Sequence, residues 1–233
     1  MRIRKKRGAW SFGGSVPKKF EKHIENSVPF YNEGHLIIKE LSDFFLFDKS
    51  LCYDIGCSTG NLLIKISKYS NKKNLKFVGL EINNDMLKFC KKNIKKNNVS
   101  NISVKNSDIK LINLKKNNLI ISYYTMQFIH PSFRQKIFDK IYNSLNWGGA
   151  FIIFEKIRGN DARFDNILNS LYVDFKEKNK FFPKEILNKS KSLRGVLEPF
   201  SDKGNIGYLK RAGFKDIQTI FHYLCFKGYL CIK

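Results

Sequence analysis

The stretch Tyr53-Asp54-Ile55-Gly56-Cys57-Ser58-Thr59-Gly60 decides the fold of this chain, because it joins a short apolar strand to a helix through a glycine-rich turn. Residues 51–55 have the continuous apolar character of a buried strand, and an amphipathic pattern over about 61–69 predicts the helix. Glycines at such a junction allow a tight turn and a close approach of the backbone to a ligand. We therefore expect a strand–loop–helix unit with a ligand at the loop.

Two acidic residues follow the loop at the ends of the next strands. Glu81 closes a strand over 75–80, where a carboxylate can accept hydrogen bonds from ribose hydroxyls. Asp108 follows the third strand region, where an adenine amino group could lie. The loop is not GxGxxG and has no Lys or Arg to hold a phosphate, which favours an adenosyl ligand without pyrophosphate. The alternative is an ordinary doubly wound domain with no ligand.

The chain from residue 50 onward alternates short apolar runs with helical patterns. Strands are predicted at 51–55, 75–80, 102–104, 119–122 and 151–154, with helices at about 61–69, 84–97 and 132–145. Strands that are apolar on both faces and separated by helices indicate a parallel sheet covered on both sides. Asn146-Trp147-Gly148-Gly149 is predicted to be a turn, and strands at about 215–221 and 224–232 are expected to pair antiparallel. The fold class is α/β, with a Rossmann-like doubly wound sheet.

Helical additions are expected on both sides of this pattern. Residues 1–50 are predicted to form an N-terminal helical cap, with helices from Ser15 to about Asn26 and from about Asn32 to Phe45. Residues 51–233 form the main domain, with a helical insertion at about 160–200 that is a candidate lid and a further helix near 202–212. A mobile charge run is expected at Arg2–Arg7.

The composition suits a globular intracellular protein. With 233 residues and 42% hydrophobic content the chain can bury a core, which argues against intrinsic disorder. No run approaches the roughly 18 apolar residues of a membrane-spanning helix, and the basic start lacks the apolar segment of a secretory signal. Five scattered cysteines show no metal-ligand spacing, so we expect no metal site and a reduced, cytoplasmic protein.

The formal net charge of +23 has two explanations. It predicts an anionic partner such as nucleic acid. However, 35 Lys stand against only 8 Arg, which is typical of AT-rich coding pressure rather than of selected phosphate or base contacts. The cluster Lys91-Lys92 and Lys95-Lys96 is correspondingly either a solvated helix face or an RNA footprint.

The motifs taken together resemble a known superfamily. YDIGCSTG at 53–60, Glu81, NSDI at 106–109 and NWGG at 146–149 are similar to the class I S-adenosylmethionine-dependent methyltransferases. Within them, NSVPFY at 26–31 and TMQFIHPS at 125–132 resemble the carboxy-S-adenosylmethionine synthase family. So do 139–142, 154–156 and 174–176. The resemblance implies a seven-stranded sheet with one antiparallel strand, and S-adenosyl-L-methionine or its carboxylated derivative as cofactor.

The resemblance also implies the site residues. The expected cofactor-binding residues are Tyr31, Asp54, Gly56, Cys57, Ser58, Gly60, Glu81, Ile82, Asp108, Ile109 and Tyr123. The candidate catalytic residues are Tyr31, Tyr123, Tyr124, Glu155 and Arg194. His130 is a further candidate at the mouth, with helix entry as its structural alternative; for Tyr124 the alternative is core packing, and for Glu155 a salt bridge with a lysine.

Two positions depart from the synthase pattern. Tyr123 stands where the family has an Asn, and Ser190 stands where the family has the Arg that reads the added carboxylate. Arg194 lies one helical turn further on and could reach the same place if the helix shifts. Lys189 or Lys191 could also substitute for the arginine.

Three functions stay open at this stage. The first is an S-adenosylmethionine-dependent methyltransferase acting on a small-molecule or tRNA-borne acceptor. The second is a carboxy-S-adenosylmethionine synthase that takes its carboxyl group from prephenate and supplies tRNA wobble-uridine modification, as the resemblance implies. The third is a basic RNA-binding module on the same fold. The relatives also imply a homodimer, and no membrane partner is expected.

Overall fold

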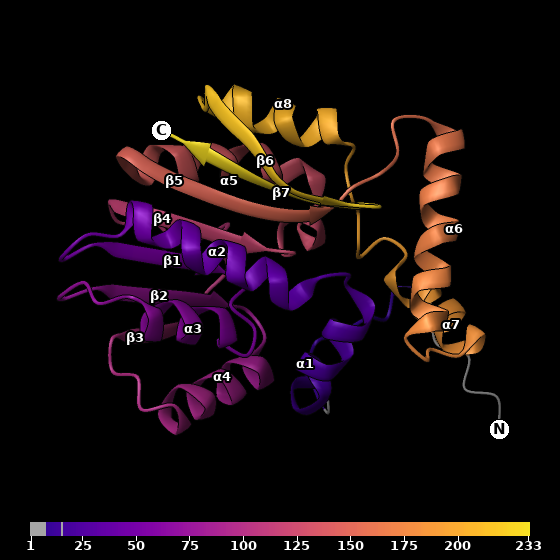
Figure 1. Ribbon diagram of the computed structural model, residues 1–233, viewed down its shortest axis with the longest axis horizontal. Helices are drawn as coiled ribbons and strands as arrows, with labels where there is room; N and C mark the ends of the chain where they lie inside the picture. Colours follow the sequence, from indigo (N-terminus) through magenta and orange to yellow (C-terminus); the bar gives the residue numbers. More distant parts are fainter. Residues whose placement is uncertain (1–7, 15) are drawn as a thin grey trace.

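The computed structural model describes residues 8–14 and 16–233, which build a seven-stranded sheet with helices on both faces (Figure 1). The charge run at 2–7 and the expected start of the first helix at Ser15 lie outside the described residues. The strands are β1 (Leu51–Ile55), β2 (Lys76–Glu81), β3 (Ile102–Asn106), β4 (Asn117–Tyr123), β5 (Leu145–Lys156), β6 (Asp216–Tyr223) and β7 (Phe226–Ile232).

The strand order is β3-β2-β1-β4-β5-β7-β6. β1 pairs in parallel with β2 and β4, and the parallel pairing continues to β3 on one side and to β5 on the other. β7 runs antiparallel between β5 and β6. The expected fold class, an α/β sheet of seven strands with one antiparallel strand, is confirmed.

Two apolar cores lie on opposite faces of the sheet. α2 (Tyr31–Phe45), α3 (Asn61–Tyr69) and α4 (Asn84–Lys96) cover one face, against side chains such as Cys52 and Phe77. α5 (Pro131–Ser144) and α8 (Asp202–Ala212) cover the other, against Tyr53 and Ile153. Neighbouring residues of one strand enter different cores because side chains alternate along a strand. The continuous apolar runs of the sequence follow from this arrangement.

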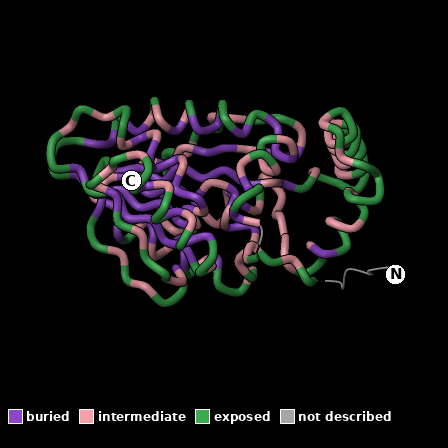
Figure 2. Tube along the Cα trace, turned by 90° about the horizontal axis from the view of Figure 1, so that it is seen from below, coloured by how far each residue is buried: buried purple, intermediate pink, exposed green. Residues whose placement is uncertain are grey.

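Three helices lie at the end of the sheet where the parallel strands finish (Figure 1). They are α1 (Val16–Ser27), α6 (Ala162–Lys178) and α7 (Pro183–Leu193). α6 has no buried residue along its length, and Figure 2 shows it as an exposed and half-buried segment apart from the buried strands. No helix within 8–14 and 16–233 is long and apolar enough to cross a membrane.

The turn predicted at 146–149 is wrong, because these residues belong to β5. Leu145 pairs with Asn117 and Ala150 pairs with Leu119, so the residues between them form a bulge within the strand. Gly148 has φ +72°, and its amide donates to the carbonyl of Lys233 at 2.9 Å. The glycines therefore serve the bulge, which keeps its backbone bonded within the sheet.

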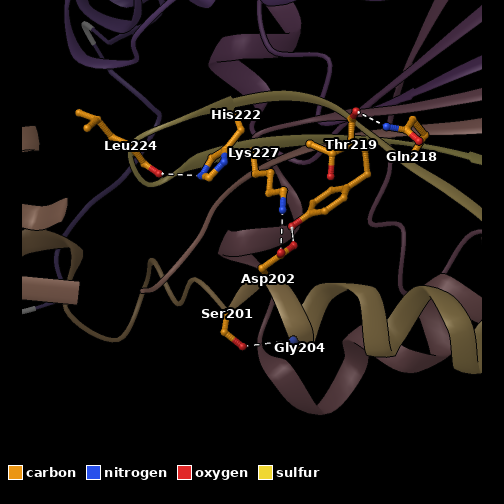
Figure 3. A network of polar contacts seen from close by, with 9 residues as sticks. Ser201, Asp202, Gly204, Gln218, Thr219, His222, Leu224 and Lys227 are labelled. Atoms are coloured by element: carbon orange, nitrogen blue, oxygen red, sulfur yellow. Dashed lines mark hydrogen bonds and ion pairs between the residues drawn. The ribbon is translucent and has the colours of Figure 1, made fainter. Parts of the chain in front are cut away.

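A polar network fixes α8 to β7 (Figure 3). Asp202 in the first turn of α8 accepts hydrogen bonds from Lys227 Nζ at 2.6 Å and Tyr229 Oη at 2.8 Å. Ser201 caps the helix by accepting the amide of Gly204 at 3.1 Å. Burial opposes ionisation of Asp202, but the hydrogen bonds from Lys227 and Tyr229 outweigh it and lower its pKa.

Candidate functional site

A cavity of about 250 Å³ lies at the carboxyl ends of the parallel strands. Its floor comes from the loops after β1, β2, β3 and β4, and its walls from α1, α2 and α7. Crevices beyond the carboxyl ends of parallel strands are the usual ligand sites of open α/β sheets. Among the described residues no group of His, Cys, Asp and Glu is arranged to hold a metal ion.

The loop after β1 presents its backbone to the cavity. Gly56 has φ +76°, and a Cβ there would collide with the side chain of Thr125. Gly60 has φ +79° where α3 begins, and a Cβ there would collide with Sγ of Cys90. The amide of Gly56 donates to the carbonyl of Leu80 at 2.8 Å, which ties the loop to the neighbouring strand. Only glycine fits both positions without strain.

Three carboxylates line the same part of the cavity: Asp54, Glu81 and Asp108. Glu81 accepts the backbone amides of Ser58 at 3.1 Å and Asn83 at 2.8 Å, which fixes its carboxylate across the glycine loop. Burial raises the pKa of Glu81 against the effect of these bonds. Burial, and then the charge of Glu81, raise the pKa of Asp54 to about 7. A ligand that brings positive charge would relieve the repulsion between these carboxylates.

Aromatic side chains follow β4 and the start of α2. Tyr123 Oη donates to the carbonyl of Tyr31 at 2.7 Å, and the two ring centroids are 5.1 Å apart. Tyr124 packs against Tyr123 with centroids 4.6 Å apart. Burial raises the pKa of all three phenols well above the usual value, so they are neutral hydroxyls. Burial, aided by the charge of Lys65, lowers the pKa of His35 to about 3, so this imidazole is neutral too.

The N-terminal segment and α7 together cover the cavity. The backbone amide of Trp10 donates to the carbonyl of Ser192 at 3.2 Å. Lys189 of α7 contacts His23 of α1, and its Nζ lies 4.5 Å from the centroid of a Trp10 ring. Burial, and then the charge of Lys189, lower the pKa of His23 to about 4. The lid expected at 160–200 therefore meets the N-terminal cap over the cavity.

The structure brings most of the sequence-predicted site residues to this one cavity. Those that line it are Tyr31, Asp54, Gly56, Cys57, Ser58, Glu81, Ile82, Asp108, Ile109, Tyr123 and Tyr124. Gly60, Glu155 and Arg194 do not line it. Arg194 is exposed at the C-terminal end of α7, and Ser190 is exposed as well. His130 is exposed and caps α5 by accepting the amide of Ser132. This agrees with helix entry, the structural alternative for this residue.

Glu155 does not line the cavity and is buried beside it, between the lining residue Lys156 and the rest of β5. Its side chain is 2% exposed and accepts the backbone amides of Met126 and Gln127, while Oε1 has no hydrogen-bond partner within the described chain. Burial raises its pKa to about 8, although the charge of Arg134 acts in the opposite direction. Its strand neighbour Lys227 instead pairs with the carboxylate of α8, so no lysine salt bridge forms across the strands.

Sequence reasoning missed several residues of the cavity wall. Trp10, His23, His35, Gln127, Lys156 and Tyr172 all line it. Lys156 stood within a motif that carried the family resemblance, and that position could have indicated it. Gln127 also stood within such a motif, at 125–132. The remaining four reach the cavity through tertiary packing, which leaves no local pattern in the sequence.

Comparison with known proteins identifies the family. A family model described as a methyltransferase domain matches residues 48–231. The carboxy-S-adenosyl-L-methionine synthase of Staphylococcus epidermidis is 38% identical over 96% of this chain and 97% of its own length. The chain belongs to the carboxy-S-adenosyl-L-methionine synthase family. The synthase of Sulfurimonas denitrificans is 34% identical over 96% of this chain and 94% of its own.

Solved structures agree with this synthase family on the fold. An S-adenosylmethionine-dependent methyltransferase of Aquifex aeolicus matches with a TM-score of 0.61 at 16% identity, over 93% of this chain and 97% of that one. Human N-acetylserotonin methyltransferase, solved in complex with S-adenosylmethionine, matches with a TM-score of 0.61 at 16% identity, over 94% of this chain and 56% of that one.

The expected enzyme class and cofactor are confirmed: this member of the synthase family is an S-adenosylmethionine-dependent transferase. The cavity fits that ligand on its own chemistry. A glycine loop offers close backbone contact, and three carboxylates line the cavity, which suits a ligand that carries hydrogen-bond donors and a net positive charge. A dinucleotide would instead require groups that hold a pyrophosphate, and the loop at 56–60 has neither the GxGxxG pattern nor a Lys or Arg.

Proposed function

We propose that the protein is a carboxy-S-adenosylmethionine synthase that transfers a carboxyl group from prephenate to the methyl group of S-adenosylmethionine. The observation that carries the proposal is the cavity itself, in which an end lined by Asp54, Glu81 and Asp108 and suited to the adenosyl ligand adjoins a space covered by α1 and α7. A roofed space suits a small second substrate rather than a macromolecular acceptor. The identity of 38% over nearly the whole length of both chains supports the same choice.

The overall reaction balances without a further reactant. The sulfonium of S-adenosylmethionine acidifies the methyl group next to it. Prephenate loses its ring carboxyl group and its ring hydroxyl as it becomes the aromatic phenylpyruvate. The methyl group exchanges a C–H bond for a C–C bond to the carboxyl carbon, and the proton leaves with the hydroxyl as water.

In this proposal each group of cavity residues has one task. The carboxylates of Glu81 and Asp108 hold the ribose and the adenine edge, and Gly56 to Ser58 line the methionine part. Asp54 offsets the positive charge of the ligand. Tyr31 and Tyr123 close the methyl end with neutral hydroxyls and exclude water, which strengthens every charge interaction in the site.

The test is a product assay. The purified protein is incubated with S-adenosylmethionine and prephenate, and the small molecules are separated and weighed by mass spectrometry. We expect S-adenosylmethionine increased by one carbon dioxide, together with phenylpyruvate. Glu81→Gln should lose most of the product, whereas the exposed control Asp43→Asn should not. Tight binding of S-adenosylmethionine without any carboxylated product would contradict the proposal.

A second candidate is methyl transfer to a small acceptor, and one observation favours it. Within the described residues no arginine lines the cavity, and the residue at the family's arginine position, Ser190, is exposed. A methyltransferase needs no reader of an added carboxylate. The same mass-spectrometric assay distinguishes the two candidates, because methyl transfer leaves S-adenosylhomocysteine and no carboxylated product.

We also propose a cytoplasmic homodimer whose product serves tRNA wobble-uridine modification, in keeping with the family. Light scattering after size exclusion measures the oligomeric state, and a monomer at micromolar concentration would contradict the dimer. Direct RNA binding is the rival explanation for the +23 charge. It predicts an RNA affinity that falls steeply with salt yet persists at physiological ionic strength.

A further inference from the structure

Two lysines lie against one aromatic ring in the cavity wall. Lys156 ends β5 and lines the cavity, and its Nζ lies 4.7 Å from the ring centroid of Tyr172 on α6. Lys176, one helical turn further along α6, places its Nζ 3.9 Å from the same centroid. Tyr172 also lines the cavity, and its Oη donates to the carbonyl of Ser27 at 2.8 Å, which holds the ring in place.

The charges of these two lysines are not matched by an acid. Among the described residues the ion pairs join Lys72 to Asp43, Lys110 to Asp108 and Lys227 to Asp202. Neither Lys156 nor Lys176 takes part in one. Burial, and then the charge of Lys156, lower the pKa of Lys176 to about 8, which is the effect of two cations close together in a half-buried place. A cation–π contact offsets only part of such a cost, whereas an anion would neutralise both charges.

The sheet order places these cations away from the acidic end of the cavity. The three carboxylates of the acidic end belong to β1, β2 and the loop after β3: Asp54 is in β1, Glu81 ends β2 and Asp108 follows β3, whereas Lys156 ends β5. β4 lies between β1 and β5, so these two strands are about 10 Å apart. The aromatic residues Tyr123 and Tyr124 lie at the end of β4, in the middle. The cavity therefore runs from carboxylates through neutral aromatic rings to ammonium groups.

We propose that Lys156 and Lys176, whose ammonium groups both lie against the ring of Tyr172, form an anion-binding subsite for a carboxylate group of the second substrate. The inference rests on the proposed function for the identity of that substrate, prephenate. Lys156, which lines the cavity, contacts the carboxylate, and Lys176, which lies behind the cavity lining, adds positive charge. The distance from the acidic end keeps this carboxylate clear of the repulsion of Asp54 and Glu81.

The experiment separates anion binding from catalysis. Prephenate binding to the protein saturated with S-adenosylmethionine is measured by calorimetry, and the KM for prephenate is measured by product formation. The variants are Lys156→Met, Lys156→Arg and Lys176→Met, and Lys178→Met on the exposed part of the same helix is the matched control. Affinity for S-adenosylmethionine, measured in parallel, reports on the acidic end alone.

We expect Lys156→Met to weaken prephenate binding and raise its KM by about tenfold to a hundredfold, the usual effect of losing a hydrogen bond to a charged group. Lys156→Arg should restore most of the affinity, Lys176→Met should show a smaller loss, and affinity for S-adenosylmethionine should change less than twofold. Unchanged prephenate binding in both Met variants would overturn the inference, as would an equal loss of affinity for both ligands, which indicates a structural role.

Failure of the proposed function gives a different pattern. If wild-type protein forms no carboxylated product but binds prephenate, and Lys156→Met weakens that binding, the subsite stands and the proposed reaction falls. If wild-type protein binds no prephenate in calorimetry, the subsite is overturned whatever the reaction proves to be. If Lys156→Met fails to fold, Lys176→Met and Lys156→Arg carry the same comparison.

Discussion

Glu155→Gln should make the stability of this protein less sensitive to pH. The carboxyl group is 2% exposed, and burial raises its pKa from the ordinary 4.5 to about 8. The folded protein therefore holds this proton more tightly than the unfolded chain, which releases it near pH 4.5. As pH rises from there to about 8, the unfolding free energy falls, by about 5 kcal/mol at most.

The glutamine variant suits this test because it preserves the shape of the side chain. One carboxyl oxygen, Oε1, has no partner within the described chain, so the NH₂ group can take its place while the amide oxygen keeps the bonds from Met126 and Gln127. Urea unfolding at pH 5.5, 7 and 8.5, followed by circular dichroism, gives the free energy at each pH. The exposed Glu40→Gln is the control and should follow the wild type.

The expected result is a difference between wild type and Glu155→Gln that grows with pH in favour of the variant. The other buried acids, Asp54 and Glu81, are present in both proteins, so their contributions cancel in the comparison. Parallel pH dependences in the two proteins would refute the reasoning, since they would mean that Glu155 is ionised in the fold at neutral pH.

Three further outcomes follow from the site. S-adenosylmethionine should bind about tenfold more weakly at pH 6 than at pH 8, because Asp54, with a pKa of about 7, must lose its proton to meet a cation; calorimetry on Asp54→Asn should show a flat profile. Gly34→Ala should cost about 2 kcal/mol in urea unfolding, because its Cβ would collide with the hydroxyl of Tyr123. The control Gly207→Ala meets only the guanidinium end of the Arg211 side chain and should be tolerated. Tyr123→Phe removes the hydrogen bond to the carbonyl of Tyr31 and should lower the unfolding free energy by about 1 kcal/mol, whereas an unchanged value would show that water replaces it.

The sheet and one half of the cavity could be predicted from local patterns. Residues 51–60 combine a strand, a positive-φ glycine loop and a helix start within ten positions, and this unit fixes the place of the ligand. Glu81 ends the next strand and Asp108 follows the one after it, and parallel strands bring such ends to one edge. In these cases the position of a residue at the end of a predicted strand is enough to place it in the cavity.

The other half of the cavity depends on contacts between distant segments. His23 meets Lys189, and Tyr172 meets the carbonyl of Ser27, across separations of more than a hundred residues. No periodicity encodes where α7 packs, so the sequence pattern could not show that Arg194 would face solvent. The bulge at 146–149 was missed for a related reason: its glycines have the local signature of a turn, and only pairing across the sheet distinguishes the two.

The position of β7 constrains how the protein can be assembled during synthesis. β6 precedes β7 along the chain, yet it bonds to the sheet only through β7. A nascent chain that has emerged as far as Tyr223 can form the five parallel strands, but it still lacks β7, the strand with which β6 pairs. The exposed edge of β5 must wait, uncovered, until residues 226–232 follow. During that interval β5 is the edge on which a chaperone, or a second nascent chain, would act.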